Sequence, residues 1–323
     1  MMKRLAGLSA LILTLFYTGL LQSTPAGAQS AQAVSASGEA GPWRQDLAAW
    51  RAQREKQLAA PDGWLTLAGL EWLKPGITSV GAAPDNRIHL SAGAPGHLGL
   101  LTLSGKSPNQ TLQLLAPAGG FPAELTVDGQ PAREGPLAVA GAKPPTMAWR
   151  GLTLAVLSRG DRFVLRIKDA NSPTRTGFHG LNWYAPDPRF RVTARWIPFT
   201  PRHIEQIPTV LGTTLDLPAP GIAEFTLDGQ TLRLEPVIED PAGKMLFFIL
   251  RDETSTTTTY GGGRFLHTGL PDHGLDQPGL LTLDFNRLEN PPCAYTPYAT
   301  CPLPPDQNRL GVAIEAGEQR YGH

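Results

Sequence analysis

The chain has few charged residues, only two cysteines and no excess charge of either sign. Charged residues make up 17% of its 323 residues, and 28 Lys and Arg balance 28 Asp and Glu. The sequence lacks the basic excess of typical nucleic-acid-binding proteins, so we expect no nucleic-acid partner. Its 35 glycines, 31 prolines and 41% hydrophobic residues indicate instead a folded, turn-rich, mainly β protein.

Several common catalytic motifs are also missing. The sequence contains no Gly-x-Ser-x-Gly, no His-Glu-x-x-His and no calcium-binding loop. The three glycines at 261–263 are not followed by the Gly-Lys-Ser/Thr of a nucleotide-binding loop. The common serine, zinc and calcium chemistries therefore have no support, and we expect no cofactor and no metal.

The one long apolar run lies at the N-terminus. Lys3 and Arg4 precede a mostly apolar segment over residues 5–21, and small residues follow at 26–28. This order is typical of a secretory signal peptide; the alternative, a retained anchor, usually needs about 20 apolar residues. We therefore expect cleavage near Ala28, export to the periplasm or the medium, and no transmembrane span after cleavage.

One amphipathic helix is predicted after a short linker. Residues 29–41 are small and polar, which predicts a flexible tether. Pro42 suits a first helical turn, and large residues recur at helical spacing through Trp50 and Leu58. Pro61-Asp62-Gly63 then ends the pattern. We assign residues 42–62 to a helical lead.

Short apolar runs broken by turn signals fill the rest of the chain. No helical pattern separates them, which predicts a sandwich or a barrel. We expect an all-β fold with an N-terminal β-sandwich over residues 63–168 and a C-terminal β domain over 169–323. Residues 123–130 (AELTVDGQ) recur as 223–230 (AEFTLDGQ), which either a duplication or convergence on one hairpin explains.

Motifs along most of the mature chain resemble a bacterial family that is catalogued as domain of unknown function 1684. They are Ala60-Pro-Asp-Gly-Trp-Leu-Thr-Leu-Ala-Gly-Leu70, Tyr260-Gly-Gly-Gly-Arg264, Asp284-Phe-Asn-Arg287, Asn290-Pro-Pro-Cys293, Cys301-Pro-Leu-Pro-Pro305, Asn308-Arg309 and Ala316-Gly-Glu318. The resemblance implies kinship and supplies no activity.

A second pattern resembles the β-sandwich of forkhead-associated domains. It comprises Leu73-Lys-Pro-Gly76, Val80-Gly81, Asn86-Arg-Ile-His-Leu90, His97 and Val127-Asp-Gly129. Where those domains read phosphothreonine with Arg and Asn, this chain has Ala82 and Asp128, and Ser91 does not match the spacing to His97. The resemblance therefore implies a sandwich topology rather than phosphopeptide binding.

Both cysteines, Cys293 and Cys301, lie in one proline-rich segment. In an exported protein such a pair is most simply a disulfide. Free structural thiols, metal thiolates or a redox pair are the alternatives, although no histidine is near in sequence and a structural zinc site needs four ligands. We also expect the loop between the cysteines to pack on the turn at residues 260–264.

The same segment concentrates the candidate site residues. The glycines before Arg264 suit either a backbone nest for an anion or a bulge with close packing. Residues 280–287 are predicted to form a strand with Asp284 and Asn286 on one face, which indicates either a pocket mouth or buried structural pairs.

Three functions remain open. The first is binding of a small polar or anionic ligand in the cell envelope, through Tyr260, Gly262, Arg264, Asn286, Arg287, Asn290 and Arg309. The second is a hydrolase with Asp284 or Glu315 as general base. The third is a structural or interaction module of the envelope, in which the polar residues form a buried scaffold.

Overall fold

A computed structural model of the chain describes residues 30–91, 93–106, 109–139, 143–159 and 161–322. The predicted signal peptide, residues 1–28, lies outside these residues. The chain divides into two compact units, Met1–Trp43 and Arg44–His323, and everything that follows α1 belongs to the second. Within the described ranges, no helix is both long and apolar enough to cross a membrane.

Helix α1 spans Ser30–Leu58, so the helix begins well before the expected helical lead and includes residues predicted as a tether. The tether prediction rested on small polar composition, yet this stretch is also rich in Ala, the residue with the highest helix propensity. Pro42, expected in the first turn, lies inside the helix. Leu47 and Leu58 are buried.

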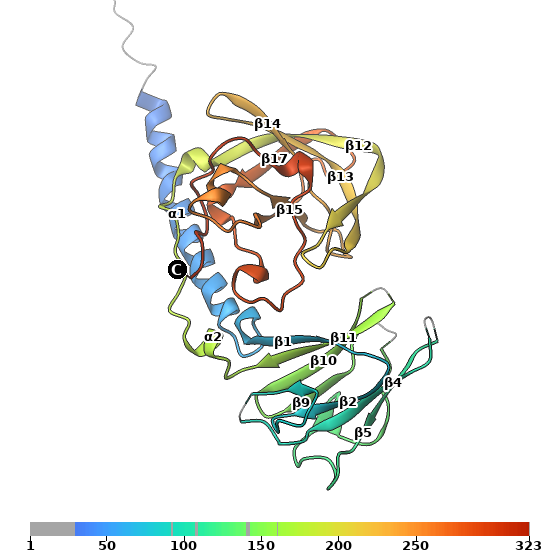
Figure 1. Cartoon of the computed structure of the whole chain (residues 1–323). Helices are drawn as coiled ribbons and strands as arrows, with labels where there is room; N and C mark the ends of the chain where they lie inside the picture. The colour runs from blue at the N-terminus through green and yellow to red at the C-terminus, as the bar shows by residue number, and fades with distance from the viewer. Residues whose placement is uncertain (1–29, 92, 107–108, 140–142, 160, 323) are drawn as a thin grey trace, which may run out of the picture. The chain divides into compact units, whose positions relative to one another are not determined.

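Two sheets occupy the residues between Leu67 and Asp169 (Figure 1). The six-stranded sheet has the order β1 (Leu67–Trp72), β11 (Arg162–Asp169), β10 (Leu152–Arg159), β9 (Thr146–Trp149), β6 (Thr126–Val127), β7 (Gln130–Pro131). The five-stranded sheet has the order β3 (Ile88–His89), β2 (Gly76–Gly81), β4 (Gly99–Ser104), β5 (Thr111–Leu115), β8 (Gly135–Pro136). Aliphatic side chains of both sheets, including Leu101 and Leu154, form one core.

The remaining strands form a four-stranded and a two-stranded sheet. The first has the order β14 (Gln230–Leu234), β13 (Thr214–Leu227), β12 (Arg191–Pro208), β17 (Gly279–Asp284), and the second pairs β15 (Leu246–Leu250) with β16 (Arg264–Thr268). Trp196, Phe225, Phe248 and Leu283 of these strands share one core. The protein is therefore mostly β, which confirms the expected fold class.

The repeated octapeptide forms the same turn twice. Asp128 and Asp228 both have φ of 49°, and the glycines that follow have φ of 81° and 78°. Positive φ at two successive residues is the signature of a type I′ turn, for which Asp-Gly is favoured. The turns join β6 to β7 and β13 to β14. The structure confirms both hairpins, and either origin of the repeat accounts for them.

Short helical turns connect the strands. They are α2 (Pro173–Thr176), η1 (Trp64–Thr66), η2 (Pro188–Phe190), η3 (Glu253–Thr256), η4 (Phe285–Arg287), η5 (Pro292–Ala294) and η6 (Asp306–Asn308). After β17 the chain runs mostly as loops, which are red in Figure 1. This tail runs alongside residues 251–259, because Leu310 N donates to Arg251 O (2.8 Å) and Glu253 N donates to Val312 O (3.0 Å).

Candidate functional site

Arg264 begins β16 and is buried, with 1% of its surface exposed. Its Nη2 donates to Asp252 Oδ2 and to Ile314 O, both at 2.8 Å. Its Nη1 donates to Ala316 O and, at 3.3 Å, to Glu318 O. Both terminal nitrogens of the guanidinium bond to protein acceptors, and its burial leaves no surface for a ligand, so Arg264 fixes the tail instead.

Asp252 completes this clamp from the other side. Its Oδ1 accepts hydrogen bonds from Thr254 N at 2.9 Å and from Ile314 N at 3.3 Å. The first bond caps η3, and the second reaches the tail. Side-chain oxygens at an N-cap satisfy helix donors that would otherwise lack a partner. One buried ion pair thus holds two segments, residues 253–258 and 312–316, in a fixed relation.

A cavity of about 530 Å³ opens between these two segments. We call it the threonine–glutamate cavity; its lining residues are Glu253, Thr254, Thr256, Thr257, Thr258, Ala313 and Glu315. Burial alternates along the tail, with Ile314 buried and its neighbours Ala313 and Glu315 exposed. Arg264 and Asp252 hold the buried side, and the exposed side faces the cavity.

The cavity is rich in hydrogen-bond acceptors. The Thr256 and Thr257 hydroxyls already donate to backbone carbonyls, at 2.9 and 3.3 Å, and so retain lone pairs for a ligand. The carboxylates of Glu253 and Glu315 offer acceptor oxygens and no donor. Such a lining suits a ligand that donates hydrogen bonds.

The expected strand at 280–287 ends early. β17 stops at Asp284, and residues 285–287 form η4. The strand prediction was wrong here because the Asp284 carboxylate accepts from Asn286 N (3.2 Å), which turns the chain into a 3₁₀ helix. Asn286 also bonds both backbone groups of Asp187. Arg287 pairs with Asp46 of α1.

The triple glycine serves packing. A Cβ on Gly262 would lie 2.5 Å from Cε1 of Tyr260, and one on Gly263 would lie 2.5 Å from Pro304 Cγ. Gly263 also has φ of 94°, which side chains rarely adopt. The close-packing alternative, not the anion nest, matches this geometry, because the adjoining guanidinium of Arg264 is buried and bonded to the protein.

The two cysteines form a disulfide. The Cα atoms of Cys293 and Cys301 are 6.2 Å apart, inside the range that permits the bond. The Tyr260 hydroxyl donates to Cys293 O at 3.3 Å, which ties the bridge to the glycine turn. The bridge therefore closes the loop against the turn at 260–264.

A second buried cluster holds the end of the tail. Glu318 accepts from Arg54 Nε (2.9 Å) through one oxygen, and from Asn290 N (2.7 Å) and Tyr295 OH (2.6 Å) through the other. Burial, and then the charge of Glu318, raise the pKa of Tyr295 well above its ordinary value. The sequence motifs contained Glu318 and Asn290, but nothing in the sequence indicated Arg54 as their partner.

The predicted ligand residues therefore do not converge. Arg264 lies under the threonine–glutamate cavity, Asn290 lies in the Glu318 cluster, and Arg309 is exposed beside Asp306 (3.3 Å). Of the two candidate bases, Glu315 lines a cavity, whereas Asp284 is buried and its side chain caps the N-terminus of η4. The cavity threonines were missed, although the run Thr254 to Thr259 was visible in the sequence.

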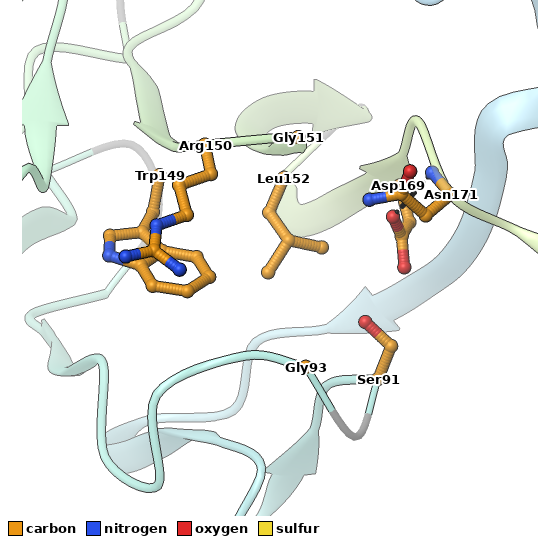
Figure 2. Close-up of a pocket in the computed structure, with 8 residues that line it drawn as sticks. All are labelled: Ser91, Gly93, Trp149, Arg150, Gly151, Leu152, Asp169 and Asn171. Atoms are coloured by element: carbon orange, nitrogen blue, oxygen red, sulfur yellow. Dashed lines mark hydrogen bonds between the residues drawn. The ribbon is translucent and has the colours of Figure 1, made fainter.

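Another cavity, of about 330 Å³, is lined by residues of β9, β10 and β11 and of the loops beside these and β3. Figure 2 shows its lining side chains. Arg150 lies over the Trp149 ring, 4.6 Å from its centroid, and pairs with Glu124 at 3.1 Å. Asp169 and Asn171 lie on the other side, where Asp169 Oδ1 accepts from Asn171 N at 2.8 Å. The cation and one face of the indole are already occupied, so this cavity offers a ligand fewer open groups.

A third cavity, of about 300 Å³, is lined by Arg54, Trp64 and Lys168 among others. The charge of Arg54 is already balanced by Glu318 and by Glu289, whose Oε2 lies 3.3 Å from Nε. Lys168 Nζ donates to Asp62 O. An anion would have to compete with the carboxylates that hold Arg54.

Comparison with known proteins gives a family without an assigned activity. Residues 176–319 match the family described as "Protein of unknown function (DUF1684)", which confirms the resemblance for the C-terminal part of the chain. The motif at residues 60–70 lies outside the match. No curated protein matches the chain.

One similar solved structure is the solution NMR structure of an uncharacterized protein from gene locus rrnAC0354 of Haloarcula marismortui. It shares 33% identity over 46% of this chain and 80% of that chain, with a TM-score of 0.39.

Proposed function

We propose that the protein binds a small polyhydroxylated ligand in the threonine–glutamate cavity. The acceptor-rich lining supports this most directly. All its lining residues also lie within the range that matches the family.

The chemistry of the lining favours one kind of ligand over another. Sugar-like hydroxyls donate to carboxylates, and a hydrogen bond to a charged group is roughly twice as strong as a neutral one. A phosphate or a carboxylate would instead meet Glu253 and Glu315, both exposed on the cavity wall. The sequence left both polar and anionic ligands open. The geometry supports polar ligands that are neutral or positively charged, and disfavours anions.

The rigidity of the walls supports binding as well. The Arg264–Asp252 pair fixes both segments before any ligand arrives. Pre-organised groups lose less conformational entropy on binding, so more of the interaction energy remains as affinity. With the predicted signal peptide, this suggests an envelope protein that holds a sugar-like molecule.

Titration calorimetry on the tag-free mature chain tests the proposal. The panel contains neutral monosaccharides and disaccharides, amino sugars and sugar phosphates. We expect a neutral or amino sugar to bind more tightly than its phosphorylated form. Glu315→Gln should weaken that binding by roughly tenfold, because a charge-assisted hydrogen bond becomes a neutral one.

Glu71→Gln is the matched control, because Glu71 is exposed on β1 and does not line the cavity. It should bind as the wild type does. The proposal is overturned if no compound in the panel binds, if sugar phosphates bind best, or if Glu315→Gln binds unchanged. Turnover of a bound sugar that Glu315→Gln abolishes would extend the proposal to the hydrolase.

A further inference from the structure

His203, Glu205 and Glu235 form a cluster that the candidate site does not use. His203 and Glu205 are two residues apart on β12, so they extend from the same face of the strand. Glu235 directly follows β14, and β13 lies between these strands in the sheet. The sheet thus brings together residues about thirty positions apart.

The nitrogen and oxygen atoms of the three side chains converge. His203 Nε2 lies 2.8 Å from Glu235 Oε1 and 3.4 Å from Glu205 Oε2. One ligand atom from each residue fits within 4.8 Å of the other two. Ligand atoms that share one metal ion at about 2.0–2.2 Å from it must lie within such distances of each other.

One oxygen of the cluster has no hydrogen bond of good geometry. Oε1 of Glu235 is buried 2.8 Å from Nε2 of His203, and neither this nitrogen nor another donor of the described residues is aligned to donate to it. A buried polar atom without a partner costs about 1–3 kcal/mol. A cation at the centre of the cluster would provide the missing partner.

Neighbouring side chains hold the three groups in place. Gln307 Nε2 donates to Glu205 Oε1 (3.0 Å), which leaves Oε2 toward the histidine. The amide of Asn308 bonds both the backbone N–H and C=O of Glu235, each at 2.8 Å. The ring of Phe199 lies 4.6 Å from that of His203. Metal ligands in proteins are typically oriented by such outer contacts.

We propose that His203, Glu205 and Glu235 bind a divalent first-row transition-metal ion, of which Zn²⁺ is the natural probe. An imidazole nitrogen with two carboxylate oxygens suits zinc and its neighbours, whereas calcium and magnesium prefer oxygen ligands alone. His203 is 44% exposed, so water can fill the remaining positions. Three protein ligands with an open position are typical of reactive rather than structural zinc sites. This replaces the expectation of no metal.

The test uses the tag-free mature chain after treatment with a chelator. Calorimetric titration with ZnCl₂ should show one site per chain, and Co²⁺ should give visible absorption bands at the same stoichiometry. His203→Ala and Glu205→Gln should each weaken Zn²⁺ binding by at least roughly tenfold, because loss of an outer contact that only orients a ligand already costs about 10–100-fold in metal affinity. Circular dichroism of each variant confirms that it is folded.

His273→Ala is the matched control. His273 is also exposed and has one nearby carboxylate, Asp272, with 3.8 Å between Nδ1 and Oδ1. This variant should bind Zn²⁺ as the wild type does. The proposal is overturned if Zn²⁺ does not bind, if His203→Ala binds unchanged, or if His273→Ala loses as much affinity.

Discussion

Between Leu67 and Asp169, aliphatic side chains such as Leu101 and Leu154 fill the space between two regular sheets. Between residues 246 and 318, the chain buries Asp252, Arg264 and Glu318 beside its apolar side chains. The difference follows from the backbone. Regular strands satisfy each other's N–H and C=O groups, whereas a tail without strands needs side chains to do so. In this tail, buried charged side chains make the hydrogen bonds to the backbone that neighbouring strands make in a sheet.

The largest effect is expected from breaking the clamp. Arg264→Met leaves Asp252 buried without its partner, which should lower the free energy of unfolding by about 3–5 kcal/mol. Urea denaturation followed by circular dichroism measures it. Arg195→Met, which removes a largely exposed arginine from its pair with Glu224, is the control and should cost much less, because Glu224 keeps Arg233 as a partner. Equal losses would contradict a structural clamp.

A substitution in the aliphatic core between the first two sheets tests how much burial stabilises that region. Leu154 is fully buried, so Leu154→Ala should cost about 3 kcal/mol through lost burial and the cavity left behind. The same denaturation experiment applies. The sugar binding proposed for the threonine–glutamate cavity should be unchanged under folding conditions. A loss of binding there would show that the two regions are coupled.

The sequence predicted the apolar region better than the polar one. The hairpins at Asp128-Gly129 and at Asp228-Gly229 follow from local turn chemistry, and both are present. The end of β17 was missed because a single side chain, Asp284, changes the backbone there. Alternation alone does not reveal that.

Contacts between residues far apart in the sequence could not be predicted for a different reason. Arg264 was identified as important, but besides the Asp252 carboxylate its acceptors are backbone carbonyls of residues 314–318, some fifty positions away. Carbonyls carry no sequence signature. The cluster of His203, Glu205 and Glu235 needs the register of three strands, which the spacing of His203 and Glu235 does not indicate.

The disulfide should have the next largest effect. The double variant Cys293→Ala, Cys301→Ala opens a loop with a sequence separation of 8 and should lower the free energy of unfolding by about 2–3 kcal/mol. Thermal unfolding with and without a reductant is the measurement. The reductant should destabilise the wild type and leave the double variant unchanged. Stability that is insensitive to both changes would contradict the role given to the bridge.

A smaller effect is expected at Tyr295. Tyr295→Phe removes one hydrogen bond to Glu318 and should cost about 1–3 kcal/mol at neutral pH. Burial raises the pKa of Tyr295, so its stability contribution is present below about pH 10 and is lost as pH rises through the folded-state pKa. Denaturation between about pH 8 and 11 should therefore show a steeper decline for the wild type than for Tyr295→Phe. Parallel declines would contradict a buried phenol.

Hydrogen–deuterium exchange of Arg264→Lys tests the central claim most directly, because lysine keeps the charge but loses the forked geometry of the guanidinium. Exchange should rise in residues 253–258 and 312–318, the two segments that the clamp holds, and stay unchanged in β10 and β11. Unchanged exchange in those two segments, or an equal rise throughout the protein, would contradict the assignment of Arg264 as the scaffold of the cavity.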